Sequence, residues 1–330
     1  MRKNIQPPEE LSNSLDSNNK TKIFVIVGVL TLFLLISLVF NFLLLKKSES
    51  NNVVDKTQNY LLATNLSQIE KKDRIIHFAP LKTDITEYIN THKNLKMSVY
   101  FEYLVTGANF SINVDLNTFP GSLTKVPIAI LILDKVEKGK LSLDQKLEIL
   151  DSFKDNTSGD LYKVPNGTTM TIKDLLEESL VHSDNTAKNI LYSLTDSDDM
   201  NILVDELGMD KLFNTEGKTT TKEYSRFFRS LYYSSMLPSE RSQYILELLS
   251  KSNRSKYMAD KIPNNIVVSH KYASLKPDRS YSDVGIVYIP NRPFILAVSI
   301  DGRDANDFTE DQAKEIISTI AKKAYDYLSK

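Results

Sequence analysis

The hydrophobic pattern of the chain begins with one long apolar run, residues 23–45, which contains no charged side chain. At about 1.5 Å of rise per residue, a helix of this length exceeds the roughly 30 Å hydrocarbon core of a bilayer. A buried core helix and a cleaved signal peptide are the alternative interpretations. The run is too long for the apolar region of a signal peptide, and no small-residue cleavage site follows it. We therefore expect one retained transmembrane helix.

Polar segments lie on both sides of this run. Residues 1–22 are the predicted cytoplasmic tail, and residues 46–77 lack a strong hydrophobic period and are interpreted as a stalk. The tail carries four basic residues and the start of the stalk carries three, namely Arg2, Lys3, Lys20 and Lys22 against Lys46, Lys47 and Lys56. The positive-inside rule therefore favours a cytoplasmic N-terminus only slightly.

From Phe78 onward the pattern is typical of a folded domain, residues 78–330. Apolar residues at helical spacing predict a helix that starts near Pro80: Leu81, Ile85, Tyr88 and Ile89. Residues 97–105 alternate between apolar and other side chains and are followed by a turn, which predicts a strand and a hairpin. Residues 126–133 are apolar on every side, as a helix buried in the middle of a domain requires.

A mainly helical region is expected from there to about Leu249, followed by strands at 266–269, 284–289 and 294–300. A final helix begins with the capping-box spacing of Thr309 and Gln312. One face of that helix is apolar: Ala313, Ile316, Ile317, Ile320, Ala321 and Ala324. The order helix, strands, helices, strands, helix predicts a mixed α/β (α+β) fold. Its antiparallel sheet is flanked by the terminal helices and interrupted by an inserted, all-helical subdomain.

Charge and composition narrow the function. The chain has 41 basic and 42 acidic residues, which argues against a nucleic-acid partner. The absence of cysteine excludes disulfides, zinc–thiolate sites and cysteine nucleophiles. The four histidines do not show metal-ligand spacing, so neither a metal site nor a cofactor is expected.

Three short elements could carry chemistry: Ser122-Leu123-Thr124-Lys125, Ser183-Asp184-Asn185 and His270-Lys271-Tyr272-Ala273-Ser274. Ser122 precedes the apolar helix, and Lys125 follows at a spacing that returns its amine to the same face. A lysine whose pKa is lowered by burial can take the proton of a serine hydroxyl and so activate it as a nucleophile. The simpler interpretations are a helix-capping serine with a surface lysine, and a turn with an N-cap at Ser183-Asp184-Asn185.

Two long stretches contain the first two elements in matching contexts, FPGSLTKVPIAILILDKVEKGKLSLDQKL and PNGTTMTIKDLLEESLVHSDNTAKNILYSL. Both resemble the serine–lysine and Ser-Asp-Asn regions of class A β-lactamases and related penicillin-binding proteins. The resemblance continues through VVSHKYASL and YSDVGIVYIPNRPFILAVSI and covers residues 78–330.

The resemblance implies a role for each motif residue. Ser122 is the acylated nucleophile, Lys125 accepts its proton, and Ser183 relays a proton to the leaving nitrogen. Asn185 binds the substrate's amide side chain, and Lys271 adds positive charge near the substrate carboxylate and Ser183. The backbone N–H groups of Ser122 and Ser274 form the oxyanion hole, in which one donor commonly contributes about 3 kcal/mol.

The chain departs from the family pattern at two places. Tyr272 and Ala273 replace the hydroxyl residue and the glycine of the usual Lys-Thr-Gly or Lys-Ser-Gly motif. Tyr272 therefore puts a bulky phenol at a position that binds substrate in the family. The omega-loop Glu-x-x-Leu-Asn signature, whose glutamate activates the deacylating water, is missing. Glu216 is the only carboxylate in the short segment that replaces it.

We therefore expect a serine hydrolase that acts on amides through an acyl-enzyme, such as β-lactams or D-alanyl peptides of the cell wall. One helix anchors it, and the catalytic domain lies outside a bacterial cytoplasmic membrane. Efficient β-lactam turnover is not expected. The alternative is a binding or scaffold protein that keeps the fold and has lost turnover. A Ser–His mechanism involving His182 or His270 is disfavoured, because no Gly-x-Ser-x-Gly elbow is present.

Overall fold

The structure, a computed structural model, describes residues 28, 37, 61, 73, 76–209, 217–253 and 257–330. Residues 59–330 form one compact unit. Apart from Gly28 and Ser37, the predicted membrane helix 23–45 lies outside the described residues, as does the tail before it. Within the described part of the chain, no helix has the length and apolarity that crossing a bilayer requires.

A five-stranded antiparallel sheet forms the centre of the unit, in the order β2-β1-β7-β6-β5. Its strands are β1 (Lys96–Tyr103), β2 (Ala108–Ile112), β5 (Val268–Leu275), β6 (Ser280–Val287) and β7 (Phe294–Asp301). The predicted hairpin and the strand predicted at 294–300 are confirmed, whereas the strand predicted at 284–289 starts four residues earlier and ends at Val287. The strand predicted at 266–269 starts two residues later and runs on to Leu275, so it carries Lys271, Tyr272 and Ser274 along one edge of the sheet.

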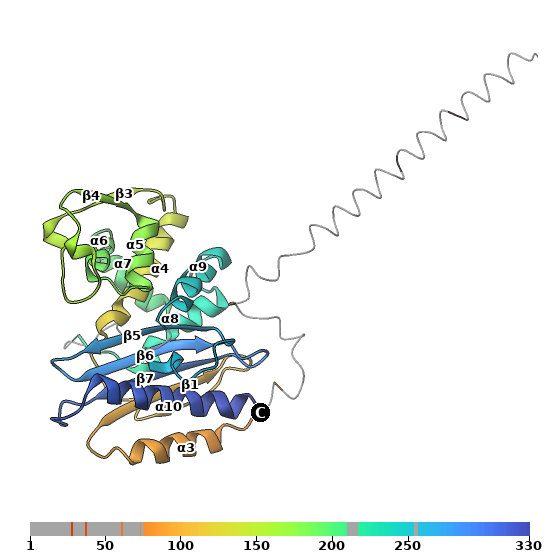
Figure 1. The fold of residues 1–330 in the computed structure, drawn as a ribbon. Coiled ribbons are helices and arrows are strands. Elements are labelled where there is room, and N and C mark those ends of the chain that lie inside the picture. The colour runs from red at the N-terminus through yellow and green to blue at the C-terminus, as the bar shows by residue number, and fades with distance from the viewer. Residues whose placement is uncertain are drawn as a thin grey trace, which may run out of the picture. The chain divides into compact units, whose positions relative to one another are not determined.

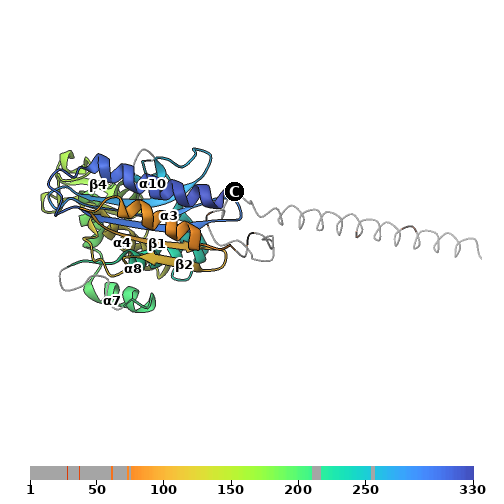
Figure 2. The ribbon, with the colours of Figure 1, turned by 90° about the horizontal axis from the view of Figure 1, so that it is seen from below.

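The terminal helices α3 (Ala79–Asn90) and α10 (Glu310–Leu328) lie together on one face of this sheet (Figures 1 and 2). The alternation of β1 turns Met97, Val99 and Phe101 into the core beneath them. Every member of the apolar face predicted for the last helix is buried, and the capping box between Thr309 and Gln312 is present. The prediction of terminal helices against the sheet is confirmed.

The opposite face of the sheet carries α8 (Thr221–Tyr233), beside α9 (Ser239–Ser250). The inserted region contains α4 (Lys125–Glu137), α5 (Ile172–Leu180), α6 (Asn185–Tyr192) and α7 (Ser197–Glu206) (Figure 1). Residues 125–133 of α4 are all buried, because this helix is surrounded by its neighbours. Short 3-10 turns lie at η2 (Gly121–Thr124), η3 (Asp151–Phe153), η4 (Leu161–Lys163) and η5 (Tyr257–Ala259).

The prediction of an all-helical insertion was wrong in one respect. Strands β3 (Lys146–Ile149) and β4 (Thr168–Thr171) pair there as a small antiparallel sheet. Each strand has four residues, and of the eight only Ile149 is fully buried. Strands so short and so exposed leave too little alternation for a periodicity argument to detect.

Two residues of the predicted stalk lie within the core of the unit. Leu61 is fully buried, and its backbone N–H donates to Oε1 of Gln243 on α9 at 3.3 Å. The Asp73 carboxylate, also buried, forms an ion pair with Arg292 at 2.6 Å. The domain packing therefore extends upstream of the predicted boundary at residue 78.

Candidate active site

A cleft of about 770 Å³ opens where η2, the turn before α6 and the edge strand β5 meet. Five of the seven predicted site residues line it: Ser122, Ser183, Asn185, Tyr272 and Ser274. Lys125 lies directly beneath the cleft, with 1% of its surface exposed. Residues from three separate stretches of the chain are thus brought to one place.

The turn that carries Ser122 depends on a glycine. Gly121 has φ = +51°, a conformation that side chains other than glycine rarely adopt. A Cβ at this position would lie 2.6 Å from Leu275 Cδ1 and 3.2 Å from Ala273 Cβ. Gly121 therefore lets η2 approach β5 although alanine stands where the family usually has glycine. Ser122 follows at the mouth of α4, inside the 3-10 turn.

Lys125 connects the other polar groups of the site. Its Nζ lies 2.9 Å from Ser122 Oγ, 3.3 Å from Ser183 Oγ and 2.6 Å from Asn185 Oδ1. An ammonium has three hydrogens, so all of them are used in this arrangement. Burial of the amine, reinforced by the nearby Lys188 ammonium, lowers the pKa of Lys125 to about 7. A large fraction of Lys125 is therefore uncharged near neutral pH and able to accept a proton.

The Ser183-Asp184-Asn185 turn completes the cluster. Ser183 has φ = +59°, and its hydroxyl donates to Ser122 Oγ at 3.0 Å. Asp184 is fully buried and caps α6 by accepting from the Ala187 N–H at 2.8 Å, so the turn and N-cap given as the simpler interpretation are present together with the polar cluster. Its second oxygen accepts from the Leu161 N–H at 2.9 Å. These bonds fix the unusual backbone at Ser183 that aims its hydroxyl at Ser122.

This geometry suits the activation of a serine nucleophile. Among the described residues, the hydrogen-bond partners of Ser122 Oγ are Lys125 and Ser183 alone. A neutral Lys125 can take the Ser122 proton as the oxygen attacks. Ser183, in contact with both, can carry a proton between Lys125 and an atom leaving on the cleft side.

Lys271 differs from the expectation. It is fully buried behind the cleft, and its Nζ donates to the Leu180 carbonyl at 3.1 Å rather than to Ser183. Burial, with a smaller effect from the charge of Lys125, lowers its pKa well below the usual value. The positive charge that the resemblance implies for Lys271, next to a substrate carboxylate, therefore does not lie at the cleft surface. Lys188 and Lys276 line the cleft instead.

Tyr272 and Ser274 lie on β5 at the cleft edge. The Tyr272 ring is half-buried and packs against Tyr257, with ring centroids 5.2 Å apart. Because β5 ends the sheet, its outer side has no strand partner among the described residues, and backbone groups there can meet a ligand. The bulky ring is accommodated by packing beside the cleft, so it narrows one wall rather than closing the site.

The two histidines next to the motifs do not join the cluster. His270 lies on the face of β5 opposite Lys271, which it shares with Tyr272, and its Nδ1 is 3.0 Å from a carboxylate oxygen of buried Asp283. His182 is exposed and has no hydrogen bond to Ser122 or Ser183. Within the described ranges, no group of three or more His, Asp or Glu side chains could hold a metal ion.

A family model described as the beta-lactamase enzyme family matches residues 80–328. The chain belongs to this family. The β-lactamase VEB-1 of Pseudomonas aeruginosa is 30% identical over 243 residues, which cover 66% of this chain and 80% of that protein. The structure of TLA-3 extended-spectrum β-lactamase has a TM-score of 0.69 at 23% identity, covering 77% of this chain and 100% of that one.

A second similar structure is a variant of PBP-A in an acyl-enzyme complex with penicillin G. Its TM-score is 0.67 at 19% identity, and it covers 76% of this chain and 96% of that chain. Family membership, together with the serine–lysine cluster, identifies the chain as a serine hydrolase of the β-lactamase type.

Several cleft residues of this β-lactamase family enzyme were not found from the sequence. Thr157 accepts from Asn185 Nδ2 at 2.7 Å, and Ser158 donates to the Ser183 carbonyl at 2.8 Å. Both belong to an irregular stretch with no recognisable motif. Lys188 could have been found, since it lies one helical turn after Asn185. Glu216, the carboxylate considered for deacylation, lies outside the described residues.

Proposed function

We propose that this enzyme forms an acyl-enzyme with β-lactams or D-alanyl peptides and releases the acyl group slowly. We further propose that a single helix anchors it with the catalytic domain outside the cytoplasmic membrane. The observation that carries the first proposal is the hydrogen-bonded cluster of Ser122, Lys125, Ser183 and Asn185 at the cleft. The PBP-A variant, which is acylated by penicillin G, supports this substrate class.

In the acylation step, neutral Lys125 takes the proton of Ser122 while Oγ attacks the amide carbonyl. The carbon–nitrogen bond then breaks, and Ser183 delivers a proton to the leaving nitrogen. The backbone N–H groups of Ser122 and Ser274 receive the negative charge on the carbonyl oxygen, each such donor contributing about 3 kcal/mol. Asn185, held between Lys125 and Thr157, positions the amide side chain of the substrate.

Slow release follows from the groups that surround the nucleophile. The carboxylates among the described residues that line the cleft are Asp278 and Glu310, and neither hydrogen-bonds to Ser122 or Lys125. The sequence lacks the omega-loop signature whose glutamate activates water in class A β-lactamases. Because no carboxylate among the described residues hydrogen-bonds to the nucleophile, we expect water to attack the ester slowly.

The test is intact-mass spectrometry of the full-length enzyme treated with penicillin G. We expect one adduct of the mass of the whole penicillin, lost in Ser122→Ala and retained in the matched control Ser197→Ala, an exposed serine on α7. The adduct should persist for minutes or longer. Rapid appearance of hydrolysed penicillin with no persistent adduct contradicts slow release. No adduct with penicillin or with an activated D-alanyl ester favours the binding-protein alternative.

Membrane anchoring rests on the uncharged run at 23–45 and needs its own test. We expect the full chain to sediment with membranes and resist extraction by high salt and alkali, and a chain lacking residues 23–45 to be extracted. Protease added to intact spheroplasts should digest the catalytic domain. Protection of that domain until the cells are lysed would overturn the proposed orientation.

A further inference from the structure

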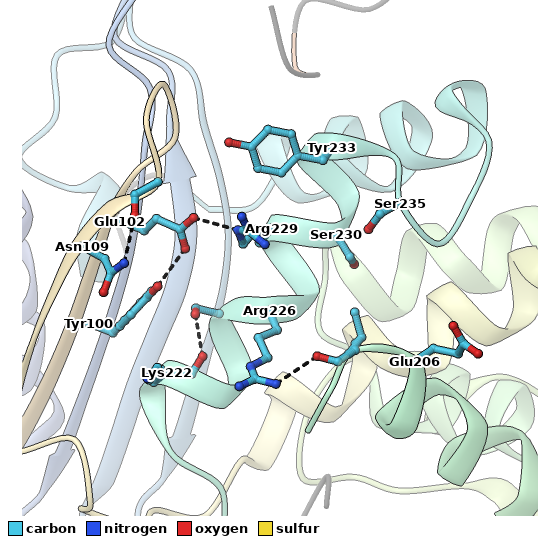
Figure 3. Close-up of a pocket in the computed structure, with 13 residues that line it drawn as sticks. Tyr100, Glu102, Asn109, Glu206, Lys222, Arg226, Arg229, Ser230, Tyr233 and Ser235 are labelled. Atoms are coloured by element: carbon cyan, nitrogen blue, oxygen red, sulfur yellow. Dashed lines mark hydrogen bonds and ion pairs between the residues drawn. The ribbon is translucent and has the colours of Figure 1, made fainter. Parts of the chain in front are cut away.

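A second cavity, of about 540 Å³, lies between the β1–β2 hairpin, the end of α7 and one face of α8 (Figure 3). None of its lining residues lines the cleft at Ser122. Its size falls in the range of small-molecule sites, and its walls are unusually polar for a cavity of that size. It is therefore separate from the acylation site.

Arg229 is held in a fixed position in this cavity. Its Nε donates to Oε1 of Glu102 at 2.8 Å, and the other oxygen of Glu102 accepts from the Tyr100 hydroxyl at 2.8 Å. The Glu102 side chain is 3% exposed, whereas that of Arg229 is 54% exposed. The guanidinium also lies 5.3 Å from the centre of the Tyr233 ring. Its two terminal nitrogens have no hydrogen-bond partner among the described residues (Figure 3).

Two more cations follow the same face of α8. Lys222, Arg226 and Arg229 are spaced at i, i+4 and i+7, which places them in one row. Arg226 uses one terminal nitrogen to donate to the Leu207 carbonyl at 3.0 Å and to that of Gly208, at the end of α7. Lys222 is exposed and forms no ion pair within the described ranges.

A row of like charges on one helix face is unfavourable by a few tenths of a kcal/mol for each pair. Glu102 neutralises only Arg229, and the remaining carboxylate in the lining, Glu206, is exposed at the rim. An anion seated between the three cations would relieve their repulsion. The planar edge of Arg229 suits a carboxylate or phosphate group, which can accept two parallel hydrogen bonds.

The rest of the lining suits hydroxyl groups. Ser225 and Ser230 each donate to a helix carbonyl three residues back, at 2.6 and 2.8 Å, which leaves their oxygens as acceptors. Asn109 donates to the Gly107 carbonyl at 2.9 Å and keeps its side-chain oxygen as an acceptor. Tyr233 offers an aromatic face of the kind on which sugar rings pack. We propose that this cavity binds a small anionic sugar, a sugar phosphate or sugar acid, with its anion on Arg229 and with the charge of Lys222 adding to the attraction.

The proposal is tested by calorimetric titration of the full-length enzyme in detergent at low ionic strength. The probes are glucose 6-phosphate, glucuronate, inorganic phosphate and, as the neutral control, glucose. We expect one or both anionic sugars to bind, glucose not to bind, and inorganic phosphate to bind at least fivefold more weakly than the better sugar. Comparison of the two sugars distinguishes a phosphate from a carboxylate ligand.

Variants locate the binding. Arg229→Gln and Lys222→Ala should each weaken binding about tenfold, whereas Lys173→Ala, an exposed lysine on α5, should leave it unchanged. Lys222 is exposed and forms no side-chain hydrogen bond or ion pair with the described residues, so its variant remains informative if Arg229→Gln unfolds by leaving Glu102 unpaired. The proposal fails if no anionic sugar binds, if inorganic phosphate binds as tightly, or if Lys222→Ala binds as well as the parent.

Discussion

At the scale of single residues, the protonation state of Lys125 controls whether Ser122 can be activated. Burial destabilises the charged form of its amine and so lowers its pKa to about 7, near physiological pH. The neutral amine that results can act as a base. The three acceptors around the amine satisfy its hydrogens but supply no full negative charge to hold the proton. Acylation is therefore expected to depend on pH.

The acylation rate should rise with pH through about 7 and level off above it, because deprotonation of Lys125 creates the base. The measurement is the rate of adduct formation with penicillin G between about pH 5 and 9. A rate that stays constant over this range, or falls as the pH rises, would exclude Lys125 as the base.

Lys188 provides a finer test of the same group. Its charge is the second cause of the low pKa of Lys125, after burial. Lys188→Gln should therefore raise the pKa of Lys125, shift the rate profile to higher pH and lower the rate at pH 7 about twofold. Lys173→Gln, on the exposed side of α5, is the control and should leave the profile in place.

At the scale of elements, the site depends on how α6 begins. Asp184 accepts one hydrogen bond from its own helix and one from Leu161 in η4, and it lies between Ser183 and Asn185, two of the three residues that contact Lys125. Gly159 approaches so closely that a Cβ there would lie 2.0 Å from the Asp184 carboxylate. One buried carboxylate thus connects two segments and sets the conformation of Ser183.

Asp184→Ala should lower the free energy of unfolding by about 2 kcal/mol, since it removes an N-cap and leaves buried N–H groups without acceptors. Acylation should slow at the same time, because Ser183 loses its support. Asp196→Ala, at the exposed N-cap of α7, is the comparison and should affect stability alone. Chemical denaturation gives the first quantity and adduct formation the second. Unchanged acylation in Asp184→Ala would show that Ser183 is held by other contacts.

The elements also show what the sequence can and cannot predict. Residues 126–133 are apolar all round, so their burial in α4 follows from composition alone. The start of the last helix at Thr309 can be predicted from its capping-box spacing. The position of Lys271 could not be predicted, because its depth is set by the Leu180 carbonyl, 91 residues away. The buried partner of Arg229 is likewise 127 residues distant, so this cavity was not detected from the sequence.

At the scale of the whole molecule, the compact unit is larger than the domain predicted from residue 78. Leu61 enters the core around α9, and Asp73 pairs with Arg292, which also donates to the Leu328 carbonyl at the end of α10. Leu61 and Asp73 therefore each contact the folded unit.

Leu61→Ala should cost about 2–4 kcal/mol of stability, the usual price of emptying a buried leucine site. Ile202→Ala, at a residue that is 62% exposed, is the matched control and should cost less than about 0.5 kcal/mol. Thermal unfolding of the full chain and both variants measures the difference. Equal effects of the two substitutions would mean that Leu61 is not part of the core in solution.

The position of α8 has a consequence for the whole enzyme. Tyr224, buried on this helix, donates its hydroxyl to the Leu123 carbonyl, one residue from the nucleophile. Its neighbour Ser225 faces the cavity with the cation row. If α8 rotates slightly as a rigid body when the proposed ligand binds in the cavity, Tyr224 on its other face would shift the Leu123 carbonyl. Reaction speed at Ser122 would then respond to the supply of a compound that never enters the cleft.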